Sequence, residues 1–236
     1  MKMVNCLSSS RALYLLLLHV VLCAMLAVGC SDSAPSGGES LSMEATSAVD
    51  TLWLFDGNTF TGWNGVNDFF RIEDGAVVAG SMERAIPQNE FLCTDARFSD
   101  FTLHFVTKMI GERTNAGVQF RTERIPDSNE VIGYQADMGI GWWGSLYDEQ
   151  RRNRLLATAD SSVIASALDP EGWNDYRVEA KGPEINLFIN GAQTVHYLED
   201  DQTLEENGRI CLQIHSGPPG EVWYRSIWVE NLAESE

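Results

Sequence analysis

The chain has 236 residues, of which 44% are hydrophobic, and its 34 acidic and 16 basic side chains give a net charge of −18. Because phosphate backbones and anionic membrane surfaces repel so acidic a protein, we exclude nucleic acid as a partner and favour an uncharged ligand. The part beyond residue 50 is long enough for one sizeable core, and no second linker interrupts it, so we expect a single folded domain.

The N-terminus has the pattern of a secretory signal, because Lys2 and Arg11 precede an apolar run over residues 12–28. The run ends in LAVGC, small residues before a cysteine, which resembles a bacterial lipoprotein signal. We expect cleavage of residues 1–29 and lipidation of Cys30, which places the protein in the bacterial cell envelope, facing the periplasm or at the outer membrane. Cleavage removes two bases and no acid, so the charge becomes −20. An uncleaved membrane anchor is the alternative.

Residues 30–50 are rich in Ser, Gly, Ala and acids, which predicts a flexible tether between the lipid and a domain over residues 51–234. This domain keeps two cysteines, Cys93 and Cys211. They form either a disulfide in an oxidising compartment or a buried pair of free thiols, and a single pair has no spacing framework that decides between the two.

The hydrophobic pattern of the domain has the period of β-strands. In residues 101–109, for example, apolar and polar side chains alternate. Further strands are predicted over residues 173–180, 184–189, 192–197, 208–215 and 221–230. The sequence Asn190-Gly191 is a strong signal for a hairpin turn. We therefore predict an all-β fold, two antiparallel sheets packed as a sandwich, in which any helix is short and near Leu204.

Three segments, residues 118–121, 134–138 and 210–215, alternate in the same way and carry polar side chains on the face opposite their apolar residues. The polar residues are Gln119 and Arg121, Gln135 and Asp137, and Gln213 and His215. If the three strands neighbour one another in a sheet, these groups form one polar floor. The alternative is a merely solvated sheet face, as expected for Arg177, Glu179 and Lys181.

An unusual segment, GYQADMGIGWWGSLYDEQRRNR (residues 133–154), begins with the second of these strands and continues beyond it. Its Trp142 and Trp143 offer flat apolar faces that stack on sugar rings or close over a pocket. Polar groups that converge beside aromatic side chains favour a site for a polyhydroxylated ligand, a carbohydrate. The tryptophans could instead form an interface with a partner protein.

Seven motifs follow one another along the domain. They are LFDGNTFTGW (54–63), NAGVQFR (115–121), GYQAD (133–137), GSLYD (144–148), WNDYRVEAKG (173–182), INLFINGAQ (185–193) and GRICLQIHSG (208–217). In this order they resemble the 3-keto-disaccharide hydrolase domain family. The resemblance implies a concanavalin A-like (LamG-like) jelly roll that acts on glycosides whose sugar is a ketone at carbon 3. Many relatives carry Tyr-Glu-x-Gln where this chain has Tyr134-Gln135-Ala136-Asp137, so the acid has moved by two positions, to the same strand face.

The implied reaction requires a base for the carbon 2 proton, an acid for the departing oxygen and a group that stabilises the enolate. We expect Asp137 or His215 to exchange these protons and Arg121 to stabilise the enolate. The expected substrate-binding residues are Gln119, Gln135, Trp142, Trp143, Tyr147 and Gln213. A sugar 3-oxidoreductase would supply the substrate. Alternatively, the changed position of the acid indicates that catalysis has been lost, and the domain is a carbohydrate-binding lipoprotein module.

Other polar residues receive less specific interpretations. Asp148 and Glu149 are adjacent on a strand and point to opposite faces, so they do not suit the acid and nucleophile of an ordinary glycosidase. We expect Arg151, Arg152 and Arg154 to pair with nearby acids, and His104 and His196 to lie at the surface. No metal-ligand spacing, phosphate-binding loop or nucleophile elbow is present in the sequence, so we expect neither a metal nor a cofactor.

Overall fold

The computed structural model describes residues 50–231, which form fifteen strands and one short helix. The predicted signal peptide (1–29), Cys30 and the tether up to residue 49 lie outside the described residues, as do residues 232–234 of the predicted domain. Within residues 50–231, no helix has the length and apolar character needed to cross a membrane.

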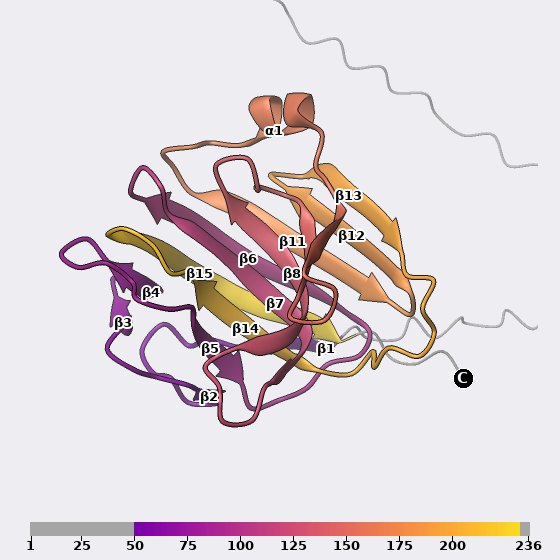
Figure 1. Ribbon diagram of the computed structural model, residues 1–236, viewed down its shortest axis with the longest axis horizontal. Helices are drawn as coiled ribbons and strands as arrows, with labels where there is room; N and C mark the ends of the chain where they lie inside the picture. Colours follow the sequence, from indigo (N-terminus) through magenta and orange to yellow (C-terminus); the bar gives the residue numbers. More distant parts are fainter. Residues whose placement is uncertain (1–49, 232–236) are drawn as a thin grey trace, which may run out of the picture. The chain divides into compact units, whose positions relative to one another are not determined.

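The strands form two antiparallel sheets. The eight-stranded sheet contains, in spatial order, β13 (Ala192–Leu198), β12 (Glu184–Ile189), β11 (Asn174–Lys181), β6 (Phe101–Ile110), β15 (Gly220–Asn231), β4 (Ala76–Ser81) and β3 (Phe70–Glu73), and β1 (Asp50–Trp53) also pairs with β15. The seven-stranded sheet contains β10 (Arg154–Ala157), β9 (Leu146–Glu149), β8 (Val131–Gly139), β7 (Asn115–Arg124), β14 (Arg209–Ile214), β5 (Glu90–Thr94) and β2 (Trp63–Asn64). The sheets pack face to face, with α1 (Ser161–Ala167) across one end (Figure 1).

The hydrophobic core lies between the two sheets, because one side of each strand carries apolar residues. Phe105 on β6 stacks on Tyr176 of β11, with 5.0 Å between ring centroids, and Phe120 on β7 stacks on Tyr134 of β8 at 5.6 Å. Phe101 of the eight-stranded sheet meets Phe120 edge to face at 6.2 Å. These large rings hold the sheets together and leave the opposite side of every strand facing outward.

The predicted strands all occur, and β12 has the predicted bounds, residues 184–189. The described residues contain one short helix, as predicted, but its expected position near Leu204 was wrong. Leu204 lies in a turn, where its N–H donates to the carbonyl of Asp201 at 3.3 Å. The Asp201 carboxylate accepts a hydrogen bond from the N–H of Thr203 at 3.0 Å, a local bond that favours a turn. The helix that does form, α1, begins after Asp160, whose carboxylate accepts a hydrogen bond from the N–H of Ser162 at 2.7 Å.

Cys93 on β5 and Cys211 on β14 lie directly opposite each other and form a disulfide, which decides between the two alternatives left by the sequence. Both cysteines are fully buried on the outer face of the seven-stranded sheet, where they pack with Phe91 and Val131. The β7–β8 hairpin therefore covers part of this outer face.

Candidate active site

The three strands with predicted polar faces are neighbours in the seven-stranded sheet, in the order β8, β7, β14. Gln135 of β8 lies opposite Gln119 of β7 on one side and Tyr147 of β9 on the other. Asp137 and Gln213 both lie opposite Gly117, from the two sides of β7. The chain continues this pairing beyond β14, since the N–H of residue 215 donates to the carbonyl of residue 115 at 3.0 Å.

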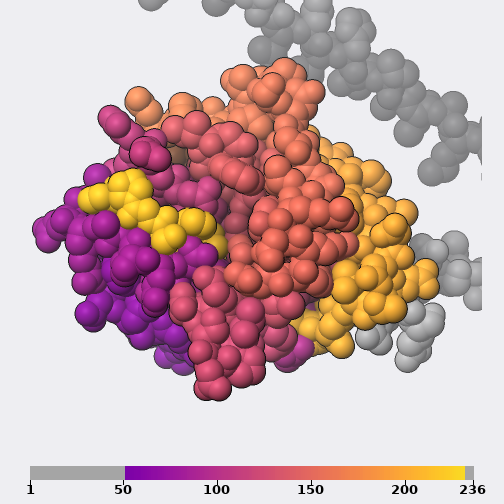
Figure 2. Space-filling view, in the orientation of Figure 1, coloured from indigo at the N-terminus to yellow at the C-terminus, as the bar shows by residue number. Residues whose placement is uncertain are grey.

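A cavity of about 310 Å³ opens on this outer face. It is lined by Asn115, Gln135, Asp137, Trp142, Tyr147, Glu149 and His215. Figure 2 views this side of the molecule, with the yellow residues that follow β14 on one side of the hollow and the orange-red residues that follow β8 on the other. Five of the nine predicted site residues therefore share one cavity: Gln135, Asp137, Trp142, Tyr147 and His215.

A chain of side-chain amides runs along the floor of this cavity to Asp137. The Nε2 of Gln119 donates to Oε1 of Gln135, and the Nε2 of Gln135 donates to Oδ1 of Asp137. Gly117 makes room for this arrangement, because a Cβ atom there would come within 2.6 Å of the Gln135 side chain. The orientation of Asp137 is thus fixed from below, and its Oδ1 is occupied as an acceptor.

Asp137 is the group with the most perturbed acidity in the cavity. Asp137 is only 2% exposed, and this burial raises the pKa of its carboxyl group from 3.8 to about 7. The hydrogen bond from Gln135 opposes the shift in pKa, and the negative charge of Glu149 adds to it. Near neutral pH, Asp137 is therefore present in both protonation states, as a group that exchanges protons with a substrate requires.

His215 lines the cavity with a defined tautomer. Its Nδ1 lies 2.8 Å from the carbonyl oxygen of Ser216, which can only accept a hydrogen bond. Nδ1 therefore carries a proton, and in the neutral imidazole the free lone pair lies on Nε2. In the structure, one ring nitrogen bonds to backbone while the side chain lines the cavity.

Asn115 and Glu149 are cavity residues that the sequence analysis did not select. Burial raises the pKa of Glu149, and Glu130 adds to this rise, whereas the nearby His215 lowers the pKa. The alternation of strands contained the signal for both residues. Asn115 is four residues before Gln119 on the same face of β7, and Glu149 is two residues after Tyr147 on the same face of β9.

Arg121 lies outside the cavity, so its predicted role beside the enolate is wrong. Its φ is +48°, and the register between β7 and β8 shifts there, so a bulge turns the side chain away from the outer face. The guanidinium donates to the carbonyls of Ser99 and Gly182, at 3.0 and 2.6 Å, and lies 3.1 Å from the Asp100 carboxylate. Arg121 therefore ties β7 to the eight-stranded sheet.

Gln119 and Gln213 lie on the predicted face but are completely buried, so they cannot contact a ligand as predicted. The β7–β8 hairpin, the segment before β5 and the chain after β14 are joined to one another by hydrogen bonds. Asn129 donates from Nδ2 to the carbonyl of Asn89 at 2.9 Å, and the N–H of Ser216 donates to Oδ1 of Asn89 at 3.0 Å. The open cavity lies toward one end of the sheet, where Asn115 at the start of β7 and His215 after β14 meet the lining residues of β8 and β9.

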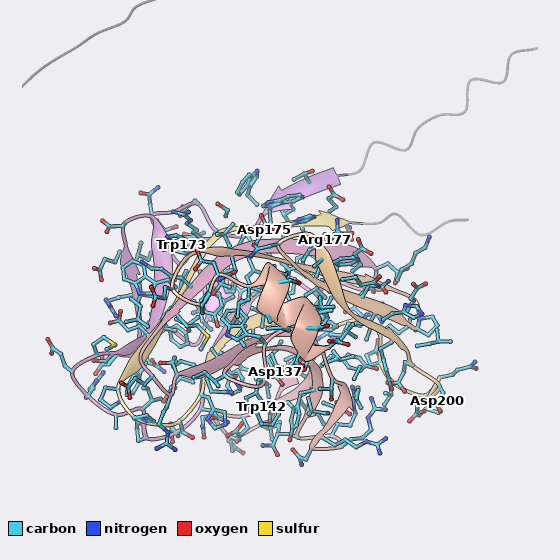
Figure 3. The ribbon with its side chains drawn as sticks, turned by 90° about the horizontal axis from the view of Figure 1, so that it is seen from above. Asp137, Trp142, Trp173, Asp175, Arg177 and Asp200 are labelled. Atoms are coloured by element: carbon cyan, nitrogen blue, oxygen red, sulfur yellow. A yellow bond between two sulfur atoms is a disulfide. The ribbon has the colours of Figure 1, made fainter. Side chains whose placement is uncertain are left out.

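The two adjacent tryptophans diverge, so only one of them fulfils the prediction for this cavity. Trp142 is 39% exposed and meets Tyr147 edge to face, with 6.4 Å between ring centroids. Trp143 instead packs against the core and lines a different cavity at the end of the sandwich. Figure 3 shows Asp137 and Trp142 on one side of the sandwich and Trp173, Asp175 and Arg177 on the other.

The other charged residues and histidines considered in the sequence lie outside the cavity, except for Glu149. Asp148 is fully buried and pairs with Arg151 and Arg152, while Glu149 lines the cavity, so the two adjacent acids do point to opposite faces. Arg154 is exposed, as is His196, whereas His104 is half-buried. Among residues 50–231, no three His, Cys, Asp or Glu side chains come close enough together to hold a metal ion.

Comparison with known proteins identifies the family. The model of the 3-keto-alpha-glucoside-1,2-lyase-like domain matches residues 52–230. The chain belongs to this family. As a member of the 3-keto-alpha-glucoside-1,2-lyase-like family, it is a glycosyl hydrolase-like domain, in agreement with the resemblance carried by the seven motifs. No curated protein matches the sequence.

Solved structures show the same fold at low sequence identity. A candidate glycosyl hydrolase from Parabacteroides distasonis ATCC 8503 is 17% identical, with a TM-score of 0.59 over 77% of this chain and 94% of that chain. The carbohydrate-binding module CBM66 from Bacillus subtilis is 14% identical, with a TM-score of 0.56 over 72% and 95% of the two chains. A Bacillus subtilis protein of unknown function with a galectin-like fold is 12% identical, with a TM-score of 0.57 over 73% and 90%. The predicted jelly-roll sandwich is thereby confirmed.

Proposed function

We propose that this protein cleaves glycosides whose sugar carries a ketone at carbon 3, by elimination followed by addition of water. The observation that carries the proposal is that Asp137 and His215, a proton donor and a proton acceptor, line one cavity beside an exposed tryptophan. Family membership supports the carbohydrate chemistry. The ketone at carbon 3 is inferred from the family description and from the acid–base pair.

The proposed reaction uses His215 as the base. A ketone at carbon 3 acidifies the carbon 2 proton, and Nε2 of His215 accepts this proton through its lone pair. The resulting enolate expels the oxygen at carbon 1, and protonated Asp137 donates a proton to that oxygen as it departs. Water then adds to the enone, which completes hydrolysis and regenerates the two groups. Release of the enone before this addition would make the reaction a lyase reaction.

The enolate oxygen requires hydrogen-bond donors, and Arg121 cannot reach it. The Asn115 carboxamide and the Tyr147 hydroxyl line the cavity, and neither side chain makes a hydrogen bond to another residue within the described part of the chain. We assign them to the enolate oxygen and to the neighbouring hydroxyl groups. The face of Trp142 stacks on the sugar ring.

A panel of 3-keto-glycosides tests this proposal, with products identified by mass. We expect free leaving group and a keto sugar from the wild-type protein, and almost none from the Asp137→Asn and His215→Gln variants. Absence of turnover across the panel, with wild-type protein that is folded by circular dichroism, would contradict the proposal.

A non-catalytic carbohydrate-binding function is the second candidate, because Gln135 stands where many relatives carry a glutamate. The likeness to a carbohydrate-binding module is compatible with it. Binding of unoxidised glycans that is lost with Trp142→Ala, together with absence of turnover, would favour this function.

We further propose a cellular location for the enzyme and a source for its substrate. A lipid on Cys30 would hold the enzyme in the bacterial envelope, with no other membrane contact, and a sugar 3-oxidoreductase would convert the carbon 3 hydroxyl to the ketone upstream. Metabolic labelling with a fatty acid tests the anchor, since a Cys30→Ala variant should lose the label.

A further inference from the structure

A second and larger cavity, of about 460 Å³, lies under α1 at the end of the sandwich. Its walls are mostly apolar and include Met109 of β6, Ile140 and Trp143 of the β8–β9 loop, and Ile164 and Leu168 from α1 and its C-terminal end. A cavity of this size accommodates a small ligand, and predominantly apolar walls with few polar groups are typical of ligand pockets.

The cavity exists because α1 does not pack down onto the core. None of its seven residues is buried, although Ile164 and Leu168 contact the core at its edge. The opposite wall is held in place by a hydrogen bond from Thr194 Oγ1 to the carbonyl of Gly144, at 2.8 Å. The helix therefore forms a roof over a hollow.

This cavity adjoins the candidate active site, because consecutive residues line the two. Thr114 and Trp143 line the cavity under α1, while Asn115 and Trp142 line the active-site cavity. Gly139 pairs with Asn115 across β7 and β8 and also lines the cavity under α1. The β8–β9 loop, which contains Trp142 and Trp143, thus contributes to the walls of both cavities.

The two cavities differ in the polar groups that they offer. In the cavity under α1, Thr114 Oγ1 already donates to the carbonyl of Ile110 at 2.7 Å, and Ser145 Oγ already accepts from the N–H of Ala159 at 3.1 Å. The other polar side chains of its lining, Glu112 and Ser161, belong to exposed residues. A second sugar would need many hydrogen-bond partners, whereas a flat apolar ring needs none and gains from contact with Trp143.

We propose that the cavity under α1 binds the leaving group of the substrate, and that this leaving group is an aromatic ring joined through a phenolic oxygen rather than a second sugar. This inference rests on the proposed function. A phenol is also a better leaving group than a sugar hydroxyl, because its anion is more stable, so the elimination asks less of the proton donor.

The test compares two 3-keto-glucosides, one of 2-naphthol and one a disaccharide, with three proteins. Ala165 on α1 lines the cavity, so Ala165→Trp fills it, whereas Ser166→Trp adds the same bulk to an exposed neighbour that does not line it. We expect wild-type kcat/KM to be at least tenfold higher for the naphthyl substrate. Ala165→Trp should raise KM for that substrate at least tenfold and leave the disaccharide unchanged, and Ser166→Trp should change neither.

Equal wild-type turnover of the two substrates, or an equal effect of Ala165→Trp on both, would overturn the inference. Binding of free 2-naphthol, followed by tryptophan fluorescence, separates this inference from the proposed function. If neither substrate is turned over, the proposed function fails. If 2-naphthol binds to the wild-type protein and to Ser166→Trp but not to Ala165→Trp, the aromatic site is still supported. If 2-naphthol does not bind to the wild-type protein, the inference of an aromatic site is overturned.

Discussion

The outer faces of the two sheets follow the same alternation and differ in what covers them. On β8 the outward side chains of Gln135 and Asp137 are buried and joined by a hydrogen bond. On β11 the outward side chains of Arg177 and Glu179 are 36% and 35% exposed, and they approach each other to 3.3 Å. A period of two therefore selects which residues share a face, while the hairpins and loops decide whether that face becomes a buried polar cavity or a solvated surface.

Replacing one acid on the outer face of each sheet should give the largest difference in turnover. Asp137→Asn removes the proton donor and should lower turnover of a 3-keto-glycoside by about 10²- to 10⁴-fold. Asp175→Asn, on the exposed outer face of β11, should leave turnover within twofold of wild type. Steady-state rates with equal amounts of folded protein measure both, and comparable losses in the two variants would show that the outer face of β8 is not special.

The two arginines are expected to differ in stability rather than in catalysis. Arg121→Met leaves the Asp100 carboxylate and two carbonyl groups without their buried donor, so the free energy of unfolding should fall by about 3–5 kcal/mol. Arg177→Met disrupts an exposed pair and should cost about 1 kcal/mol or less. Denaturant unfolding measures both changes. A loss of kcat in folded Arg121→Met protein, without a matching loss of stability, would show that Arg121 takes part in the reaction.

The buried carboxyl group should also make stability depend on pH. The pKa of Asp137 rises from 3.8 in the unfolded chain to about 7 in the folded chain, so between these values the folded state holds a proton that the unfolded chain has lost. The free energy of unfolding therefore falls as the pH rises from about 4 to about 7, by about 4 kcal/mol at most.

Asparagine does not ionise, so the free energy of unfolding of Asp137→Asn should increase relative to that of the wild type as the pH rises from about 4 to about 7. Groups common to the two proteins largely cancel in this difference. Thermal unfolding at several pH values provides the measurement, and a difference that stays constant between pH 4 and 7 would show that Asp137 ionises normally.

The smallest effect is a displacement of the pH profile. Because protonated Asp137 is the proposed acid, kcat/KM should decline as the pH rises above about 7. The negative charge of Glu149 raises the pKa of Asp137, so Glu149→Gln should move this decline to lower pH. A profile that keeps its position would show that the two carboxyl groups do not interact during the reaction.

Much of this architecture followed from the sequence, since alternation gave the strands and brought β14, β7 and β8 into one hypothesis about a polar floor. It failed at Arg121, because the bulge that redirects this side chain leaves no periodic signature. It failed for Gln213 because a strand pattern shows which face a side chain lies on but not how deeply that face is buried. The divergence of Trp142 and Trp143 depends on the path of a loop, which local pattern does not specify.

Gly117 carries a consequence for how the site could be retuned. Alanine there is compatible with the strand backbone, but its methyl group would displace the Gln135 side chain from the sheet into the cavity. The same displacement would take away the hydrogen bond that lowers the pKa of Asp137. One added carbon would thus shrink the space for the sugar and weaken the acid together, so substrate fit and optimum pH cannot vary independently at this position.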